Sequence, residues 1–513
     1  MMPCTVCVKI NDRLNINGEL CTVKYIGSIP AWPNTVAYGV EWDHDRRGKN
    51  NGSLQGVTYF STTDNRTSGS FIKEKALLST MIQGISFEEA LLMKYGDNRT
   101  RSSDIKYKFG SKETEAYGFE RLNESNSNFS QLKSITLSQT NINKATNPDI
   151  QDSMVFNNNL FTSVRYLDLS FNLFSDINEV YRILTRFPCV KTLVLSGNCF
   201  PVLKIDDESF KFPQVKEISL ARCKLKNNDL GEILTVFPSL EIIDLSCNFL
   251  TDLTVIQSSW KQLNISGNMF SKIPAQLLTK GSSLTHIEVS NNKITELDGL
   301  PTNEKIESLR IDANNIQNWN EIDKCNNIFP NLRTLWVQKN PIVEPDTQAN
   351  FYNTIARISS LTCVNGTPIN EELRKEAELY FISQVVSGQI HLDDHYRDHN
   401  DSSVWEHLVK KHKIDTKATR SEMRPRNFLD AEMSDLTIVY GSHSEKIPIL
   451  KSISVRFLKT LLRHKLHLPG SSSSSSIKLQ YSVREDATRH EFRYEFSPLA
   501  LYNIEESTVY VNT

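Results

Sequence analysis

The sequence predicts a multidomain protein with a small β-rich N-terminal domain, a central α/β repeat solenoid and a C-terminal α+β domain. Three observations lead to this prediction: a glycine- and asparagine-rich motif inside a β-rich stretch, a leucine pattern that recurs nine times, and a β-β-α-β-β order of elements near the end. A chain of 513 residues is too long for one hydrophobic core. We place the segments at 1–82 (first domain), 83–128 (linker with a short β segment), 129–385 (repeats with a C-terminal cap), 386–430 (polar linker) and 431–513 (last domain).

The motif of the first domain reads GKNNGSLQGVTYF at 48–60. Its glycines recur every four residues, and glycine reaches positive φ and allows a second chain to approach closely. Lys49 supplies a charge, the two asparagines supply amide donors, and the Tyr-Phe pair supplies flat apolar area. This inventory suits an extended peptide with an acidic, aromatic end, although turn chemistry alone also produces such hairpin loops. The candidate binding residues are Trp42, Gly48, Lys49, Asn50, Asn51, Gly52, Gly56, Tyr59, Phe60 and Phe71.

The flanks of the motif strengthen the binding interpretation. VAYGVEWD precedes it with Trp42, and TSGSFIK follows it with Phe71. Together these segments resemble a CAP-Gly domain, a small β-rich module that binds the carboxy-terminal tails of tubulin and of microtubule-tip proteins. The family motif reads GKNDG, and here Asn51 replaces the Asp. Asn has nearly the same shape and turn propensity, so we expect the loop to persist with one negative charge fewer beside Lys49.

The middle of the chain repeats the pattern L-x-x-L-x-L-x-x-N-x-L. From Asn172 to Asn340 the Asn positions follow one another in steps of 20 to 26 residues, which is the period of leucine-rich repeats. One repeat cannot bury its apolar residues alone, so the repeats must stack. The buried Asn satisfies backbone groups of adjacent turns. Thr140 and Cys223 replace it in two copies.

The residues between the apolar positions of each strand are expected on the concave face of the solenoid. An exposed aromatic or a charged residue there is a candidate contact for a protein partner, although an ordinary solvated strand face is the simpler interpretation for any one of them. The array ends at 359–381 in a strand-like segment and a helix with Leu373, Ala377 and Phe381 on one face, as expected of a cap. The candidate concave contacts are Tyr166, Ile242, Asp244, Glu288 and Trp336.

Composition excludes several function classes. The formal net charge of −2 gives no basic footprint for nucleic acid. No apolar run is long enough for a bilayer, and the start lacks the pattern of a signal peptide. Nine cysteines, an odd number, favour reduced thiols in the cytosol. We find no P-loop, HExxH or GxSxG pattern and expect neither an enzyme nor a cofactor.

Two clusters of potential ligands are candidate metal sites. Cys4 and Cys7 form a CxxC without a second ligand pair, so we expect thiols packed in a strand. His391, His395 and His399 are spaced by four in the second linker, where a charged, hydrated helix is the simpler interpretation. We therefore predict no metal site.

The last domain begins with the strand DLTIVYG and continues through a second strand into an amphipathic helix with Leu458, Leu461, Leu462 and Leu466 on one face. Six serines at 471–476 form a loop, and further strand-like segments follow. The order of elements resembles a ubiquitin-like fold. The chain ends in TVYVNT without a Gly-Gly pair, so we expect a binding role rather than conjugation.

The whole order of domains resembles one family, tubulin-specific chaperone E, also called tubulin-folding cofactor E. The resemblance implies a cytosolic, cytoskeleton-associated protein that captures α-tubulin through the CAP-Gly groove and the repeats. It also implies action with tubulin cofactors C and D and β-tubulin in the assembly of αβ-tubulin, and with cofactor B in its dissociation. GTP hydrolysis would belong to tubulin. The alternative is a microtubule-binding adaptor that recruits a partner through the repeats. A single CAP-Gly domain and a nearly neutral chain favour soluble tubulin.

Overall fold

The computed structural model forms two compact units, Met1–Asn315 and Ile316–Thr513, which are described separately. The residues that the structure describes are 8–44, 46–63, 67–96, 107–109, 112–114, 129–147, 160–201, 203–279, 283–343, 348–386, 390, 404–413, 433–466, 478–482, 488–492, 494–502 and 507–512.

The first unit opens with a β-rich domain built on a five-stranded antiparallel sheet in the order β6-β3-β2-β1-β7. Its core is apolar and includes Val23, Val40, Trp42 and Leu77, all at most 2% exposed. The elements are β1 (Arg13–Ile16), β2 (Glu19–Ile29), β3 (Trp32–Trp42), the hairpin of β4 (Ser53–Leu54) and β5 (Val57–Thr58), β6 (Gly69–Lys73), α1 (Glu74–Thr80) and β7 (Met81–Ile82).

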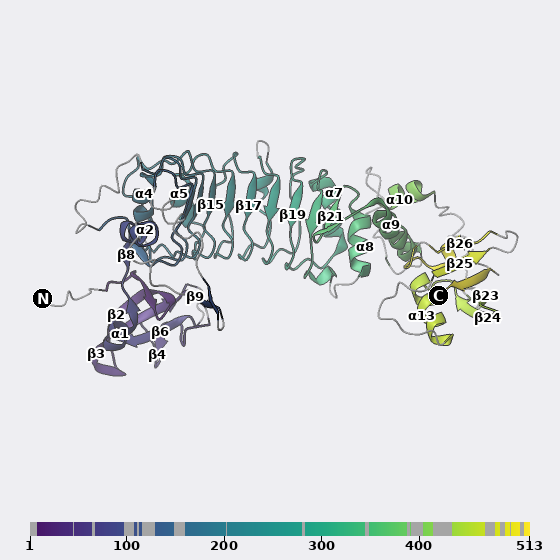
Figure 1. The fold of residues 1–513 in the computed structure, drawn as a ribbon, viewed down its shortest axis with the longest axis horizontal. Helices are drawn as coiled ribbons and strands as arrows, with labels where there is room; N and C mark the ends of the chain where they lie inside the picture. The colour runs from purple at the N-terminus through teal and green to yellow at the C-terminus, as the bar shows by residue number, and fades with distance from the viewer. Residues whose placement is uncertain are drawn as a thin grey trace. The chain divides into compact units, whose positions relative to one another are not determined.

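The rest of the first unit is a solenoid of short parallel strands that follow one another in chain order (Figure 1). Every strand pairs with the next without a register shift, so Tyr166 stands beside Thr192 and Ile242 beside Gln262. This arrangement confirms the predicted repeats and their register. The strands are β11 (Ser134–Thr136), β13 (Tyr166–Asp168), β14 (Thr192–Val194), β15 (Glu217–Ser219), β16 (Ile242–Asp244), β17 (Gln262–Asn264), β18 (His286–Glu288) and β19 (Ser308–Arg310).

A ladder of buried asparagines joins successive turns, as the pattern predicts. Asn172 accepts from the backbone N–H of Ile142 at 3.0 Å and donates to the carbonyl of Leu169 at 2.9 Å. At the copy that lacks Asn, the Cys223 thiol donates to the carbonyl of Leu195 at 3.4 Å and so replaces one bond of the amide. The connecting elements include β12 (Ile142–Lys144), α4 (Ile177–Leu184), α5 (Asp229–Leu234) and the 3₁₀ helix η2 (Ala275–Leu278).

The segment predicted as a linker at 83–128 contributes an N-terminal cap to the solenoid, which corrects that prediction. Strand β8 (Ile85–Ser86) pairs with β12, and helix α2 (Phe87–Tyr95) follows. Ser86 and Glu89 form a capping box that satisfies the first N–H groups of α2. The fully buried Phe87 packs against Phe187 with ring centroids 5.9 Å apart and covers the open end of the repeats. Farther along, β9 (Tyr107–Phe109) and β10 (Lys112–Thr114) form the expected short strand pair.

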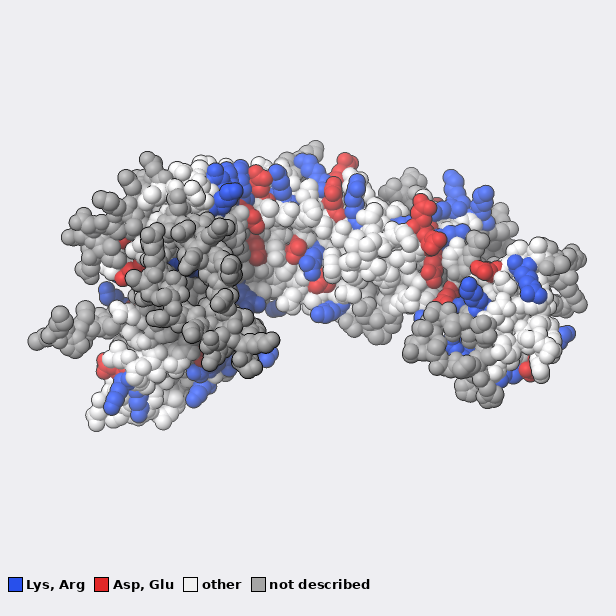
Figure 2. Space-filling view, viewed as in Figure 1, with Lys and Arg blue, Asp and Glu red and all other residues white. Residues whose placement is uncertain are grey.

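Charges on the solenoid have mixed sign. On the face shown in Figure 2, blue and red residues alternate over the solenoid. Among the described residues of the solenoid, ion pairs join neighbouring turns, such as Lys261 with Glu241 at 2.6 Å and Lys272 with Glu296 at 2.5 Å. The charges on this face therefore do not add up to a long-range electrostatic field of one sign.

The second unit begins with the last repeat and its cap. Strand β21 pairs in parallel with β20 and antiparallel with β22, and helix α9 packs on α8. Ala377 and Phe381 of α9 are buried, as predicted, and Leu373 is half-buried. The elements are α6 (Trp319–Asp323), α7 (Cys325–Ile328), β20 (Thr334–Trp336), η3 (Pro341–Val343), α8 (Gln348–Arg357), β21 (Cys363–Val364), β22 (Thr367–Pro368), α9 (Glu371–Val386) and α10 (Val404–His412).

The C-terminal domain is a mixed five-stranded sheet in the order β24-β23-β27-β25-β26 with helix α13 against it. The parallel pairing of β23 with β27, flanked by antiparallel pairs, confirms the predicted ubiquitin-like fold. Leu458 and Leu462 are fully buried as expected, whereas Leu461 is only half-buried and Val455 completes the core. The serine loop 471–476 lies outside the described residues. The elements are β23 (Met433–Tyr440), β24 (His443–Leu450), α13 (Val455–Lys465), β25 (Lys478–Ser482), β26 (His490–Glu491), η5 (Leu499–Tyr502) and β27 (Thr508–Asn512).

Candidate functional site

Four aromatic rings gather on one side of the N-terminal sheet. Tyr59 lies edge-on to Tyr25 at 5.2 Å and to Phe71 at 5.5 Å, and Phe60 lies 5.5 Å from Phe71. Phe60 is buried, while the other three rings are half-exposed. Rings that are packed yet partly open provide rigid apolar area for a ligand at little entropic cost. We call these four rings the aromatic cluster.

Tyr25 belongs to the aromatic cluster but was not among the residues predicted from sequence. It lies on β2, far from the motif along the chain, and reaches the cluster because β2 pairs with β3. The only sequence signal was an aromatic residue in a strand that precedes the motif.

Glycines make room for the aromatic cluster. A Cβ on Gly39 would lie 2.5 Å from the ring of Phe60, and a Cβ on Gly52 would lie 2.0 Å from the carbonyl oxygen of Phe60. Gly52 also has φ +95°, which side chains rarely tolerate. Gly48 is equally restricted, because a Cβ there would come within 2.0 Å of the Thr67 carbonyl oxygen. Gly56 has open space around it, and the turn requires glycine there because its φ is +80°, which other residues rarely adopt.

The polar residues of the motif divide into two roles. The side-chain oxygens of Asn50 and Asn51 accept from the backbone of Gly52 at 3.0 Å and of Ser53 at 3.3 Å, so they hold the turn. An Asp would accept the same bond as Asn51, which explains why the substitution leaves the loop intact. The Lys49 backbone is anchored on the Gly69 carbonyl at 2.7 Å, and its side chain is exposed. Lys49 is therefore the cation that this loop presents to solvent.

The structure corrects the placement of Trp42. Its ring is 2% exposed, and its Nε1 donates to Ser70 Oγ at 3.0 Å inside the core. The guanidinium of Arg47 covers the ring at 4.5 Å. Trp42 supports the strands that carry the aromatic cluster but does not face a ligand there.

Next to the aromatic cluster the N-terminal domain contacts the solenoid through buried and half-buried charges. Lys224 Nζ donates to Glu41 Oε1 and to the Trp42 carbonyl, both at 3.1 Å. Asp43 receives two bonds from the Arg13 guanidinium, at 2.6 and 2.5 Å. The Cys199 thiol lies 3.6 Å from the same carboxylate. We call these groups the charged interface.

The charged interface shifts the pKa values of its members. Burial favours the neutral carboxyl of Asp43, but the Arg13 guanidinium outweighs it and holds the pKa of Asp43 below its usual value. Burial also opposes the charge on Glu41, but Lys224 and the Thr63 N–H keep the pKa of Glu41 low. Burial, with the nearby Asp43, raises the pKa of Cys199 to about 11, so the thiol remains protonated.

The concave candidates in the first unit lie where the repeat pattern placed them. Tyr166 and Ile242 stand in one row of the sheet, and Asp244 and Glu288 stand in the next. Asp244 accepts from Ser219 Oγ at 3.0 Å and Glu288 lies 3.7 Å from Arg310, so both carboxylates are also tied to neighbouring strands. Trp336, on β20, belongs to the second unit and is half-buried.

Within the described residues, no group of three or more His, Cys, Asp or Glu side chains is arranged to hold a metal ion. The tract with His391, His395 and His399 lies outside that part of the chain. The seven described cysteines are all free thiols. No helix in the described part combines the length and the apolar character that crossing a membrane requires.

Comparison with known proteins identifies the family. The family model of the CAP-Gly domain matches residues 10–77. Protein PAC2 of Saccharomyces cerevisiae is 30% identical over 510 residues, which cover 97% of this chain and 95% of the yeast protein. Tubulin-specific chaperone E of Xenopus laevis is 27% identical over 96% of both chains. Tubulin-folding cofactor E of Arabidopsis thaliana is 27% identical over 93% of this chain and 91% of the plant protein. Because these relatives match it almost from end to end, the chain belongs to the tubulin-specific chaperone E family, also named tubulin-folding cofactor E.

Proposed function

We propose that this protein is a tubulin-folding cofactor that binds α-tubulin and acts with other tubulin cofactors on αβ-tubulin heterodimers. The observation that carries the proposal is the near full-length match to proteins named tubulin-specific chaperone E, which spans all the domains rather than the CAP-Gly module alone. The partners are α-tubulin, β-tubulin and cofactors B, C and D, and the location is the cytoplasm. Such a role needs tight and selective binding but no catalytic residue.

The aromatic cluster and Lys49 form the groove that holds the acidic, aromatic end of the α-tubulin tail. Half-exposed rings can receive the terminal aromatic side chain, and the exposed ammonium of Lys49 can pair with a tail carboxylate. The glycines of the motif let the backbone of the tail approach the loop.

The first test is the substitution Lys49→Ala. Loss of a charge-assisted hydrogen bond should weaken binding of a peptide ending in Glu-Glu-Tyr by roughly 1–3 kcal/mol, measured by calorimetry. Lys75→Ala is the matched control, because Lys75 is an exposed lysine on α1 of the same domain. Equal affinity of wild type and Lys49→Ala, together with equal affinity for a peptide that lacks the terminal aromatic residue, would refute the groove.

The concave face of the solenoid binds the folded body of α-tubulin. A tail peptide offers a small contact, whereas a row of parallel strands can present an interface of standard size. Charge reversal at Asp244 and Glu288 together, or Trp336→Ala, should reduce capture of tubulin from cytosol while tail-peptide affinity stays constant. Unchanged capture by well-folded variants at all three positions would move this contact to another surface.

The ubiquitin-like domain docks other cofactors. Removal of residues 431–513 should leave tail-peptide binding unaltered and impair assembly with cofactor D or dimer dissociation with cofactor B in a reconstituted reaction. Full activity of the shortened chain in both reactions would contradict this role. Recovery of polymerised microtubules instead of soluble α-tubulin in a pull-down would favour the adaptor alternative.

A further inference from the structure

The aromatic cluster and the charged interface share one face of strand β3. Side chains two residues apart on a strand point to the same side and are separated by about 7 Å. At Gly39 this side is filled by Phe60 and Tyr25 of the aromatic cluster. At Glu41 it is occupied by the carboxylate that binds Lys224 of the solenoid. The distance from a ligand in the groove to the repeats therefore corresponds to a few residues of extended peptide.

On the solenoid, this surface is continued by the residues that directly follow the ladder Asn, or the Cys that replaces it, in successive turns. We call these residues the column. In two successive turns this residue is Cys199 and Lys224, and both contact the N-terminal domain. In the next two turns it is Phe249 and Met269, and Met269 is 36% exposed. The N-terminal domain thus covers the column at Cys199 and Lys224. In the next two turns the column is apolar, and it is exposed at Met269.

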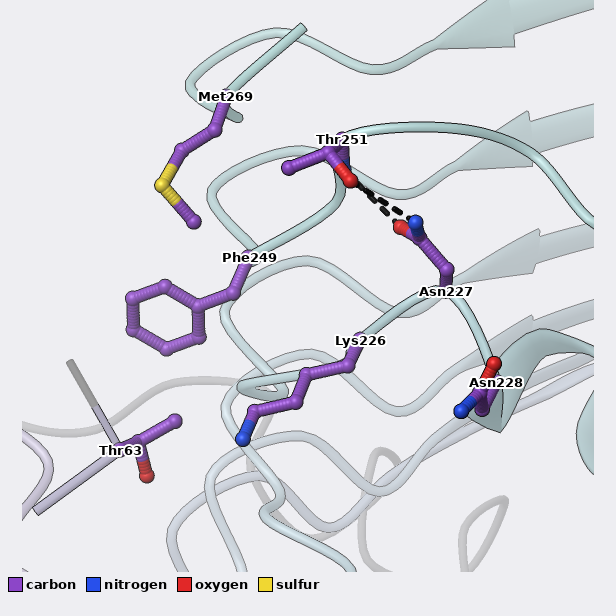
Figure 3. Close-up of a pocket in the computed structure, with 7 residues that line it drawn as sticks. All are labelled: Thr63, Lys226, Asn227, Asn228, Phe249, Thr251 and Met269. Carbon is purple, nitrogen blue, oxygen red and sulfur yellow. Dashed lines mark hydrogen bonds between the residues drawn. The ribbon is translucent and has the colours of Figure 1, made fainter.

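A cavity of about 500 Å³ lies at this point. Figure 3 shows Phe249 and Met269 projecting from successive turns into the same space, with Lys226 extending toward Thr63 of the N-terminal domain. Asn227 and Thr251 form a wall, joined by a 2.8 Å hydrogen bond. Thr63 is three residues after Phe60, so the cavity begins at most about 10 Å along the chain from the aromatic cluster.

We propose that this cavity is a second subsite for the acidic peptide whose end lies in the groove. The peptide continues from the aromatic cluster to the solenoid edge, where a carboxylate meets Lys226 and an apolar side chain packs on Phe249 and Met269. Lys226 is exposed and its charge is of the sign that an acidic peptide requires. The site then recognises residues about three to six positions before the terminal aromatic residue. This inference rests on the proposed groove.

The test compares two synthetic peptides on the full chain by calorimetry. The short peptide is acetyl-Glu-Glu-Tyr, and the long peptide carries about eight additional residues, mostly Glu with one Leu. The long peptide should bind about tenfold more tightly, as expected for one exposed ion pair plus partial burial of two apolar side chains. Lys226→Ala and Met269→Glu should each reduce this advantage severalfold and leave the affinity for the short peptide unchanged.

Met93→Glu is the matched control, since Met93 is an exposed methionine on α2 that does not line the cavity. A photoreactive residue at the Leu position of the long peptide should crosslink to Phe249 or Met269. If the short peptide fails to bind, the groove itself is wrong. If both peptides bind equally and the variants have no effect, the groove stands and the second subsite is refuted. A change in self-association on light scattering with Met269→Glu, without a change in peptide affinity, would instead make this surface a contact between copies and overturn the inference.

Discussion

Inside the first unit the N-terminal domain meets the solenoid through ion pairs, whereas inside the second unit the solenoid cap meets the ubiquitin-like domain through aromatic rings and cations placed over them. In the first unit Lys224 of the solenoid pairs with Glu41 at 3.1 Å and lies 3.9 Å from Asp43. Asp43 is held in turn by Arg13 of its own domain. In the second unit Phe496 lies edge-on to Tyr352 at 5.4 Å and to Tyr380 at 6.3 Å. A cavity of about 310 Å³ opens beside these rings.

The two contacts differ in how strictly each fixes the orientation of the two domains that it joins. A buried ion pair offsets its desolvation only in a geometry that satisfies its hydrogen bonds, so displacement of the partner is costly. Aromatic rings keep most of their attraction over a range of edge-on and offset arrangements. The charged interface therefore fixes one orientation, while the aromatic contact tolerates adjustment.

The largest expected effect comes from breaking the charged interface. Asp43→Ala should lower the free energy of unfolding by roughly 3–5 kcal/mol, because it leaves the fully buried Arg13 guanidinium of the same domain without its ionic partner and removes a carboxylate beside Lys224 of the solenoid. Chemical denaturation followed by tryptophan fluorescence measures this change. Glu19→Ala is the control, because its pair with Arg47 is more than 40% exposed on both sides and should contribute less than about 1 kcal/mol. Equal effects of the two substitutions would show that burial of the Asp43 pair adds nothing to its contribution to stability.

The core of the ubiquitin-like domain should be the next most sensitive. Leu458→Ala should lower its unfolding free energy by about 2–5 kcal/mol, because the side chain is fully buried in the domain core. Hydrogen exchange should report faster exchange in β23 and β27. The half-buried Leu461 should be less sensitive to the same truncation. Loss of protection in α8 and α9 to the same extent would show that the aromatic contact couples the two domains rigidly, against our expectation.

Acid should weaken the charged interface selectively. The pKa values of Glu41 and Asp43 are lowered in the folded state, so the stability they contribute is complete above the usual carboxyl pKa values and is lost as the pH falls through the lowered ones. The unfolding free energies of wild type and Asp43→Asn should therefore begin to converge below about pH 4 and approach one another as the pH falls through the lowered pKa of Asp43. This effect is smaller than that of Asp43→Ala, because a protonated carboxyl keeps its shape. A difference that persists unchanged down to pH 3 would contradict the charged character of the contact.

The smallest effect should follow from changing the aromatic contact. Phe496→Leu keeps apolar bulk but removes edge-on ring geometry, which corresponds to about 0.5–1.5 kcal/mol. Hydrogen exchange in α8 and α9 should rise modestly while the core strands of the ubiquitin-like domain stay protected. A loss as large as that for Asp43→Ala would mean that this contact is as specific as the charged one.

Periodicity made the solenoid predictable from the sequence. Each strand, its register and the buried ladder position follow from a pattern that recurs, and the Asn172 bonds match the predicted role of the amide. Cys223 also lies in the ladder as expected. Helix α2 was missed as a cap because its capping box, Ser86 to Glu89, occurs once and shares no pattern with the repeats.

The aromatic cluster was only partly predictable, because a local motif does not report contacts between distant strands. The motif indicated Lys49 and the Tyr-Phe pair, but Tyr25 joins the cluster through strand pairing alone. Trp42 was assigned to the groove because aromatic type says nothing about which face of a strand a side chain occupies. The contact of Asp43 with Arg13 and Lys224 carries no sequence signal, since the lysine lies in a solenoid turn remote from both other residues along the chain.

The charged interface has a consequence for avidity. If one ligand carries both a tail for the groove and a folded body for the concave face, the two sites act as a bivalent receptor, and the ligand's tail must cover the span between them. The effective concentration of the body then depends on the length of the ligand's own tail, because Lys224 of the solenoid is in contact with the N-terminal domain at Glu41 and Asp43. Shortening that tail below the span would abolish the gain, and lengthening it would lower the effective concentration gradually.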